Sequence, residues 1–271
     1  MMPMMNDLDL IIKQYPEDMN ALHVYAIGDV HVGSPQYNDE AIRRKIQIIR
    51  DDPIAVVCVC GDLGDFGLKN SKTNVYQATM QPKEQQEFII DLFAPIADKI
   101  TAFVPGNHED RLTRETGIDQ MLTIACRLGI EDTYRENLAI TKYIFGSQEG
   151  NKGKRNAFIG VTSHGSTRNK HNRFIATGFD GADFFIAGHN HVSEYGRHGK
   201  IKIDAIHETA KHIPYASIIV DANLDPGGYG LKKEYEIAPA HELQFLELTS
   251  FREKNQRRRN HKVMNYHAIQ I

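Results

Sequence analysis

The 271-residue sequence contains no tryptophan, only three cysteines, and no apolar stretch long enough to cross a bilayer. A membrane helix needs about 18 consecutive apolar residues, so we expect no membrane segment. Residues 1–7 lack the basic and apolar parts of a secretory signal. The cysteines are odd in number and split along the chain, at Cys58, Cys60 and Cys126, which is typical of free thiols in a reducing compartment. We therefore expect a cytoplasmic protein.

The sequence also lacks a strong excess of charge of either sign. The formal net charge is −3, which argues against a protein that coats nucleic acid, although a local basic patch is compatible with it. The content of 41% hydrophobic and 25% charged residues is ordinary for a soluble globular protein. Composition therefore indicates a globular protein, and its activity must be inferred from motifs.

Five short segments place metal-ligand residue types directly after an apolar run. They are 28–31 (Gly-Asp-Val-His), 61–62 (Gly-Asp), 106–109 (Gly-Asn-His-Glu), 163–165 (Ser-His-Gly) and 188–191 (Gly-His-Asn-His). The apolar runs predict strands that are buried on both faces. Open α/β sheets place their sites just past the carboxyl ends of such strands, where glycine lets the backbone turn. Five such coincidences in one chain predict a dinuclear metal centre.

Helical patterns lie between these predicted strands. Ile42, Ile46 and Ile49 share one face of a helix that Asn38 or Asp39 can cap. Further helices are predicted at 82–95 and 118–129, and further strands at 200–206, 215–220 and 244–249. Strands that alternate with helices imply βαβ units.

In order and residue type, the five segments resemble the motifs of the calcineurin-like metallophosphoesterase superfamily. Those motifs are D-x-H, G-D, G-N-H-[DE], a lone H and G-H-x-H, and the resemblance runs from Asp29 to His191. It implies an α/β fold, the four-layer α/β/β/α sandwich of two mixed sheets flanked by helices. Since the five segments must meet at one site, we expect one domain over 1–251, followed by a basic C-terminal tail at 252–271 that is partly disordered. The overall pattern is similar to stand-alone phosphoesterases of bacteria and phages.

The resemblance implies seven metal ligands. It assigns one metal ion to Asp29, His31, Asp62 and His191, and the other to Asp62, Asn107, His164 and His189. Asp62 then bridges the two ions, and its charge offsets their repulsion. Nitrogen and oxygen ligands without thiolate favour two divalent ions such as Mn²⁺, with Fe, Zn²⁺ or Ni²⁺ as alternatives.

The resemblance also implies two catalytic residues. His108 follows the ligand Asn107 and corresponds to the family's general acid, which protonates the leaving oxygen. Asp65 matches the second Asp of the family's G-D-x-x-D variant, so its carboxylate is expected to hydrogen-bond and orient His108.

We accordingly predict hydrolysis of phosphate esters by a hydroxide held between the two metal ions. Phosphodiesters are favoured, with nucleic acid or a nucleotide as the substrate. The alternative is a phosphomonoesterase, either a nucleotidase or a protein phosphatase. A third alternative is a non-catalytic binding scaffold, but scaffolds of the superfamily lose the catalytic histidine or several ligands, whereas all are present here. No feature indicates the oligomeric state.

One departure from related branches bears on the substrate. Protein phosphatases of this superfamily carry G-D-x-x-D-R-G, whose arginine helps to clamp a phosphate, and Phe66 stands at that position here. Arg111 or Arg114 could replace that cation, although a solvated helix face explains both equally well. A basic loop with Arg168, Lys170 and Arg173 begins just past His164, where it would suit a polyanionic backbone or form a solvated charge run.

The basic loop predicts a test of the nuclease hypothesis. Neutralising Arg168, Lys170 and Arg173 together should raise KM for an oligonucleotide and flatten its salt dependence, by about 0.7–0.9 in logarithmic slope per lost phosphate contact. A small synthetic diester has no flanking phosphates, so its kcat/KM should be unchanged across the same salt series. Equal effects on both substrates would contradict a polynucleotide substrate.

Overall fold

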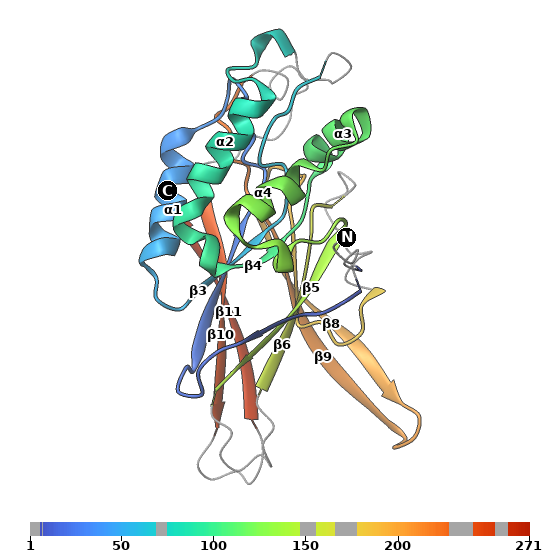
Figure 1. Ribbon diagram of the computed structural model, residues 1–271. Coiled ribbons are helices and arrows are strands. Elements are labelled where there is room, and N and C mark those ends of the chain that lie inside the picture. The colour runs from blue at the N-terminus through green and yellow to red at the C-terminus, as the bar shows by residue number, and fades with distance from the viewer. Residues whose placement is uncertain are drawn as a thin grey trace.

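The computed structural model describes residues 6, 8–68, 75–146, 156–165, 178–227, 241–252 and 260–271. Two mixed β-sheets pack face to face, with helices on the outer side of one of them (Figure 1). This confirms the predicted α/β class of two mixed sheets with flanking helices. Within the described ranges, no helix is both long and apolar enough to cross a membrane.

The five-stranded sheet has the strand order β11-β10-β2-β3-β4. Its strands are β2 (Ala21–Ile27), β3 (Ala55–Val59), β4 (Ile100–Phe103), β10 (Glu242–Arg252) and β11 (Asn260–Gln270). The first three run parallel, whereas β10 pairs antiparallel with both β2 and β11. Every residue of β3 and β4 is buried, as their continuous apolar runs predict. The carboxyl ends of β2, β3 and β4 therefore lie along one edge.

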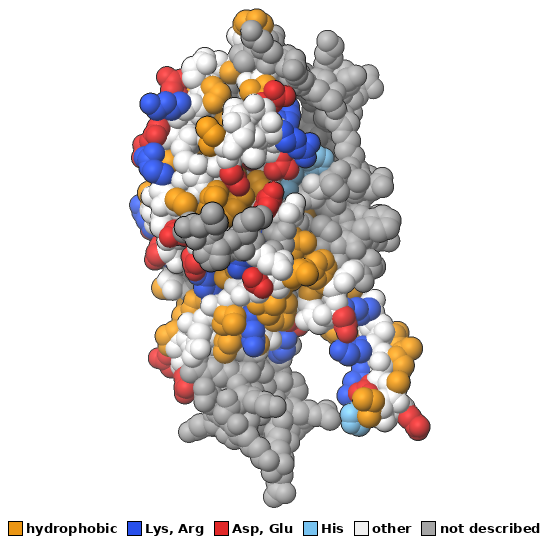
Figure 2. Space-filling model, turned by 45° about the vertical axis from the view of Figure 1, so that its right-hand side comes forward, with side chains coloured by type: hydrophobic (Ala, Val, Ile, Leu, Met, Phe, Trp, Pro, Cys, Tyr) orange, Lys and Arg blue, Asp and Glu red, His pale blue; other side chains and the backbone are white. Residues whose placement is uncertain are grey.

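The six-stranded sheet has the strand order β1-β5-β6-β7-β9-β8. Its strands are β1 (Ile11–Gln14), β5 (Leu138–Phe145), β6 (Asn156–Ser163), β7 (Phe184–Ala187), β8 (Glu194–Asp204) and β9 (Thr209–Ile219). β6 and β7 are parallel, so their carboxyl ends also meet at one edge. β8 and β9 extend as an arm beyond the other strands, with Ile201, Ile203 and Ile206 exposed towards its tip (Figures 1 and 2).

In the described part of the chain, four helices connect the strands of its first half. They are α1 (Asp39–Asp51), α2 (Pro82–Phe93), α3 (Asn107–Thr116) and α4 (Gln120–Leu128), with short 3-10 turns η1 (Val75–Gln77), η2 (Ala94–Lys99) and η3 (Glu131–Thr133). The Asn38 side chain caps α1 by accepting from the Ala41 N–H. The prediction was wrong for Ile118, which lies outside α4 and is 55% exposed, because Asp119 caps that helix one residue later.

The two largest apolar cores among the described residues hold these layers together. The first lies between the sheets and contains both predicted core cysteines, Cys58 and Cys60, with Tyr143 and Phe184. The second lies between α1, α2 and α4 and the outer face of the five-stranded sheet, where Ile42, Ile89 and Phe103 belong to it. Both sheets are therefore fixed relative to each other, and the two sets of carboxyl ends face a common site.

The structure corrects the prediction of a C-terminal tail at 252–271. Residues 260–270 form β11, which pairs with β10 over its whole length. Its residues are mostly polar because it is an edge strand, so only a few side chains pack inward: Met264 and Tyr266 on the inter-sheet core and Ile269 on the helix-side core. The predicted boundary at 251 thus falls inside a continuous sheet. The basic cluster at 253–259 lies outside the described residues.

Candidate metal centre

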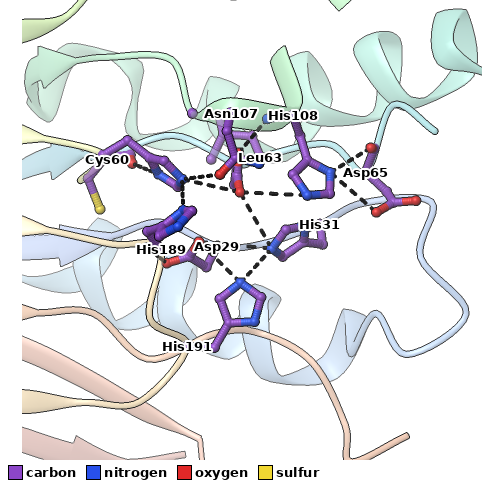
Figure 3. A network of polar contacts seen from close by, with 12 residues as sticks. Asp29, His31, Cys60, Leu63, Asp65, Asn107, His108, His189 and His191 are labelled. Atoms are coloured by element: carbon purple, nitrogen blue, oxygen red, sulfur yellow. Dashed lines mark hydrogen bonds and ion pairs between the residues drawn. The ribbon is translucent and has the colours of Figure 1, made fainter. Parts of the chain in front are cut away.

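The seven predicted ligands come together at the edge where the carboxyl ends of strands from both sheets meet (Figure 3). Asp29 and His31 follow β2, and Asp62 follows β3. Asn107 opens α3 just after β4. From the other sheet, His164 follows β6, and His189 and His191 follow β7. Asp29 and His191 therefore share one site although they are 162 positions apart in the chain.

One cluster consists of Asp29, His31, Asp62 and His191, whose ligand atoms all lie within 4.8 Å of one another. The His31 Nε2 atom is 3.1 Å from His191 Nε2 and 3.9 Å from both Asp29 Oδ1 and Asp62 Oδ2. The His191 Nε2 atom is 3.5 Å from Asp29 Oδ1. Two imidazole nitrogens and two carboxylate oxygens thus converge on one point.

A second cluster joins Asp62 to His164 and His189, whose ligand atoms also lie within 4.8 Å of one another. The His164 Nε2 atom is 3.2 Å from Asp62 Oδ2, 3.2 Å from His189 Nδ1 and 3.1 Å from Asn107 Oδ1. Its other ring nitrogen, Nδ1, donates to the Cys60 carbonyl at 2.8 Å. That bond fixes the tautomer and leaves Nε2 with a lone pair directed into the cluster. Asp62 belongs to both clusters.

The donor atoms fit a pair of divalent cations. Asp29 Oδ1 is buried and has no hydrogen-bond partner among the described residues. Such an orphaned oxygen is costly to bury. Cys60 lies nearby but its thiol donates to the Ile27 carbonyl, and burial, followed by the charge of Asp29, raises its pKa well above the usual value. The available donors are therefore nitrogen and oxygen without thiolate, a set that suits Mn²⁺, Fe or Zn²⁺.

The backbone is strained at the same positions. Five of the seven predicted ligands have positive φ angles, although none is glycine: Asp29 (50°), His31 (54°), Asp62 (51°), His189 (76°) and His191 (61°). Residues with side chains rarely adopt this region, and each such residue costs about 1–3 kcal/mol. Because the strain coincides with the convergent donors, it is the conformation that aims these side chains at one point.

The electrostatics of the clusters favour positive charge opposite Asp62. Burial opposes ionisation of Asp62, but the neighbouring His164 and His108 hold its pKa well below the usual value, so the carboxylate stays charged. Burial likewise disfavours a charged His164, yet Asp62 and Asp29 raise its pKa to about 10. The same carboxylates that increase the proton affinity of His164 Nε2 attract a metal cation to that atom.

Glu109 has a role that motif reasoning did not assign. Its fully buried carboxylate accepts four backbone N–H groups, from Asp62 (3.0 Å), Leu63 (2.8 Å), Gly64 (3.1 Å) and Gly106 (2.9 Å). The side chain therefore ties the turn after β3 to the turn after β4. This close approach requires Gly61, since a Cβ there would lie 2.3 Å from the Gly106 nitrogen. The position of Glu109 as the acidic residue of the G-N-H-[DE] motif could have indicated this role from the sequence.

His108 lies beside the two clusters, on the first turn of α3 (Figure 3). Its Nδ1–H donates to the backbone carbonyl of Asp65 at 2.7 Å, while the Asp65 carboxylate oxygen is 3.4 Å away. The Asp65 carboxylate was the expected partner of His108, and the carbonyl of the same residue is a second and nearer acceptor. Burial lowers the pKa of His108, but the charge of Asp62 and the hydrogen bond to the Asp65 carboxylate together raise it above the usual value.

The predicted substrate-binding residues have different positions. Arg111 lies on α3, and its Nε and Nη2 are buried without a hydrogen-bond partner among the described residues. Arg114 is exposed on the last turn of the same helix. Arg168, Lys170 and Arg173 lie outside the described residues. Phe66, at the position of the clamping arginine, is buried in the helix-side core.

The sequence matches the calcineurin-like phosphoesterase family over residues 22–193, which is more than half of the chain. The protein belongs to this family. The matched span begins in β2 and ends two residues after His191, so it contains all seven predicted ligands and His108. A comparison with curated proteins gave no match.

Two solved structures are similar to this chain at low identity. One is a conserved uncharacterized protein from Streptococcus pneumoniae TIGR4, described as a predicted phosphoesterase. It shows 11% identity and a TM-score of 0.37, with 91% of this chain and 99% of that chain covered. The other is Chaetomium thermophilum Vps29, with 9% identity and a TM-score of 0.38, covering 92% of this chain and 97% of that chain.

Glu109→Gln should destabilise the turns that carry Asp62 and Asn107. The amide keeps one acceptor oxygen but turns an NH₂ group towards backbone N–H groups, so bonds to a charged acceptor are lost. We expect the free energy of unfolding to fall by about 2–4 kcal/mol and the bound metal to decrease, measured by calorimetry and elemental analysis. Glu115→Gln, the same exchange at an exposed position of α3, is the matched control. Equal stability and metal content in both variants would contradict the role of Glu109.

Proposed function

We propose that this protein is a phosphoesterase that depends on two divalent metal ions and prefers phosphodiesters. The observation that carries the proposal is the meeting of two Asp/His clusters that share Asp62, with His108 beside them. Asp29, His31, Asp62 and His191 would hold one ion. Asp62, Asn107, His164 and His189 would hold the other. The presence of all these groups in one site supports an enzyme over a binding scaffold.

The donor set favours Mn²⁺, with Fe, Zn²⁺ and Ni²⁺ as alternatives. Bound at these residues, a pair of divalent ions supplies Lewis acidity for the phosphoryl oxygens and lowers the pKa of a water molecule. The protein's contribution is to keep the donors converged, through the Glu109 carboxylate and the strained turns. The free cysteines among the described residues support the expected reducing, cytoplasmic compartment.

His108 would act as the general acid. Its Nδ1–H is engaged by the Asp65 carbonyl, so Nε2 is the ring atom that faces the site, 3.8 Å from Asp62 Oδ2. The raised pKa of His108, in which Asp62 and Asp65 outweigh the opposing effect of burial, favours the protonated ring. A proton on Nε2 can then pass to the leaving oxygen of the ester as the bond to phosphorus breaks.

The proposed preference for diesters rests on the small positive charge that the side chains near His108 offer to a substrate. A phosphomonoester carries about 1.5–2 negative charges near neutral pH, whereas a diester carries only one. Phe66 replaces the clamping arginine and is fully buried, so it offers no charge to the substrate. Arg111 has unpartnered, buried guanidinium N–H groups within the described part of the chain, which suit a single phosphoryl group or one phosphate of a nucleotide or nucleic acid.

The proposal is tested by assaying the Mn²⁺-loaded protein on bis-p-nitrophenyl phosphate and on p-nitrophenyl phosphate. We expect the diester to be hydrolysed with the higher kcat/KM, chelation to abolish both activities, and Mn²⁺ to restore them. Single- and double-stranded DNA and RNA then separate nuclease activity from small-molecule hydrolysis. A higher kcat/KM for the monoester would favour a nucleotidase or protein phosphatase instead.

Asp62→Asn is the variant that tests the shared carboxylate in the same assay. It keeps the size of the side chain but removes the negative charge common to both clusters, so both ions should bind more weakly. Elemental analysis of the Mn²⁺-loaded wild type should give two ions per chain. One ion or none in the wild type would contradict the dinuclear centre, independently of any activity.

His108→Ala should keep both metal ions and lower turnover by about 10²–10⁴-fold, the usual contribution of a positioned general acid. The loss should be largest for diesters with poor leaving groups, because good leaving groups depart without protonation. Measuring kcat across a series of aryl and alkyl diesters checks this dependence. An unchanged rate with a poor leaving group would show that His108 is not the acid.

A further inference from the structure

A glutamine outside all of the family motifs lies behind His108. Gln85 is on α2, and its side chain is fully buried. Its Oε1 accepts the backbone N–H of Phe66 at 2.8 Å, and its Nε2 donates to the Met80 carbonyl at 2.9 Å. One partner is a donor and the other is an acceptor, so a flipped amide would lose both bonds. The orientation of the amide is therefore determined.

The backbone around Gln85 leaves space for this amide. Gly33 has a φ of +92°, and a Cβ at that position would lie 2.4 Å from Gln85 Nε2. Gly33 follows directly on the turn that carries His31. The amide of Gln85 is thus packed between the turn after β2 and the segment that follows β3, and it has no room to adopt another position.

The peptide group between Asp65 and Phe66 connects Gln85 to His108. Its N–H donates to Gln85 Oε1 at 2.8 Å, and its carbonyl oxygen accepts from His108 Nδ1 at 2.7 Å. Hydrogen bonds at both ends of one peptide group polarise it and strengthen each other. Phe66 has a φ of 39°, which is disfavoured for a residue with a side chain. Its ring is anchored in the helix-side core, so the orientation of this peptide is held from both sides.

We propose that Gln85 is a positioning residue for His108 and acts through the Asp65–Phe66 peptide group. The chain of bonds runs from the Met80 carbonyl through the Gln85 amide and the peptide to His108 Nδ1–H. It holds the hydrogen on Nδ1 and turns Nε2 towards Asp62. The inference rests on the proposed role of His108 as general acid, because the correct tautomer is needed only if Nε2 transfers a proton.

The test compares Gln85→Leu with Gln85→Glu in the metal-loaded protein. Both variants remove the NH₂ group that donates to the Met80 carbonyl, but only leucine also removes the acceptor for the Phe66 N–H. We expect Gln85→Leu to lower kcat for a poor-leaving-group diester by about 10–100-fold, the usual effect of a residue that orients a functional group. KM and the rate with a good leaving group should change little. Gln85→Glu should retain most of the activity, although both variants lose stability.

Two controls separate positioning from a general loss of structure. Gln86→Leu makes the same exchange at the next position of α2 and should leave the leaving-group dependence as in the wild type. In the His108→Ala background, Gln85→Leu should cause no further loss, because its effect passes through the missing ring. Additive losses, or equal losses with good and poor leaving groups, would overturn the proposal.

A measurement without catalysis distinguishes this inference from the proposed function. NMR of the Zn²⁺-loaded protein with ¹⁵N-labelled histidine can observe the His108 Nδ1–H, which is assigned as the signal that disappears in His108→Ala. In the wild type, this hydrogen should exchange slowly with solvent. Gln85→Leu should shift it and speed its exchange, whereas Gln85→Glu should leave it nearly unchanged. An unshifted signal in Gln85→Leu would overturn the positioning role. If His108→Ala leaves turnover intact, the acid assignment fails, and the signal still decides whether Gln85 orients the ring.

Discussion

The burial of the Asp62 carboxylate is the constraint on which the rest of the site depends. An isolated carboxylate in an apolar interior is very unfavourable unless hydrogen bonds or opposite charges compensate it. Here Asp62 is 1% exposed, and its Oδ1 accepts the backbone N–H of His108 at the start of α3. Its Oδ2 faces the imidazoles of His164 at 3.2 Å and His31 at 3.9 Å. Both sheets and a helix terminus are therefore needed to place this one charge.

A second buried carboxylate, Glu109, lies next to the same turn, so two acidic groups must be stabilised in one apolar region. Burial, followed by the proximity of Asp62, raises the pKa of Glu109, whereas the backbone N–H groups lower it. The two acidic groups have different partners. Glu109 takes four backbone N–H groups from the two turns, and this leaves the Oδ2 atom of Asp62 facing the histidines. Among the described residues, Glu109 thus binds only backbone N–H groups, whereas Asp62 accepts one backbone N–H through Oδ1 and keeps Oδ2 facing the histidines.

Much of this arrangement could be predicted from the sequence, because it follows from short patterns. A buried parallel strand followed by a ligand residue type determines both the strand and the edge at which the ligand lies. Asn38 was one of two predicted caps, with Asp39, because Asn and Asp side chains are good acceptors for helix N–H groups, and the structure has Asn38 as the cap. Edge strand β11 was missed because few of its side chains are buried, so its apolar pattern is weak. The Asp65 carboxylate was predicted beside His108, but the nearer acceptor, the Asp65 carbonyl, was missed because a backbone carbonyl belongs to every residue type.

Phe66 links the packing of the helix-side core to the orientation of His108. In related branches the residue after this Asp is an arginine that reaches the phosphate, whereas here it is a fully buried aromatic ring. A ring anchored in the core can hold a backbone conformation that would otherwise be unfavourable, and the φ of 39° at Phe66 is such a conformation. The position then serves the orientation of His108 instead of the binding of charge. Under the proposed function, a cationic contact to the substrate would come from another element. Arg111, whose Nε and Nη2 have no hydrogen-bond partner among the described residues, lies one helical turn beyond His108 on α3.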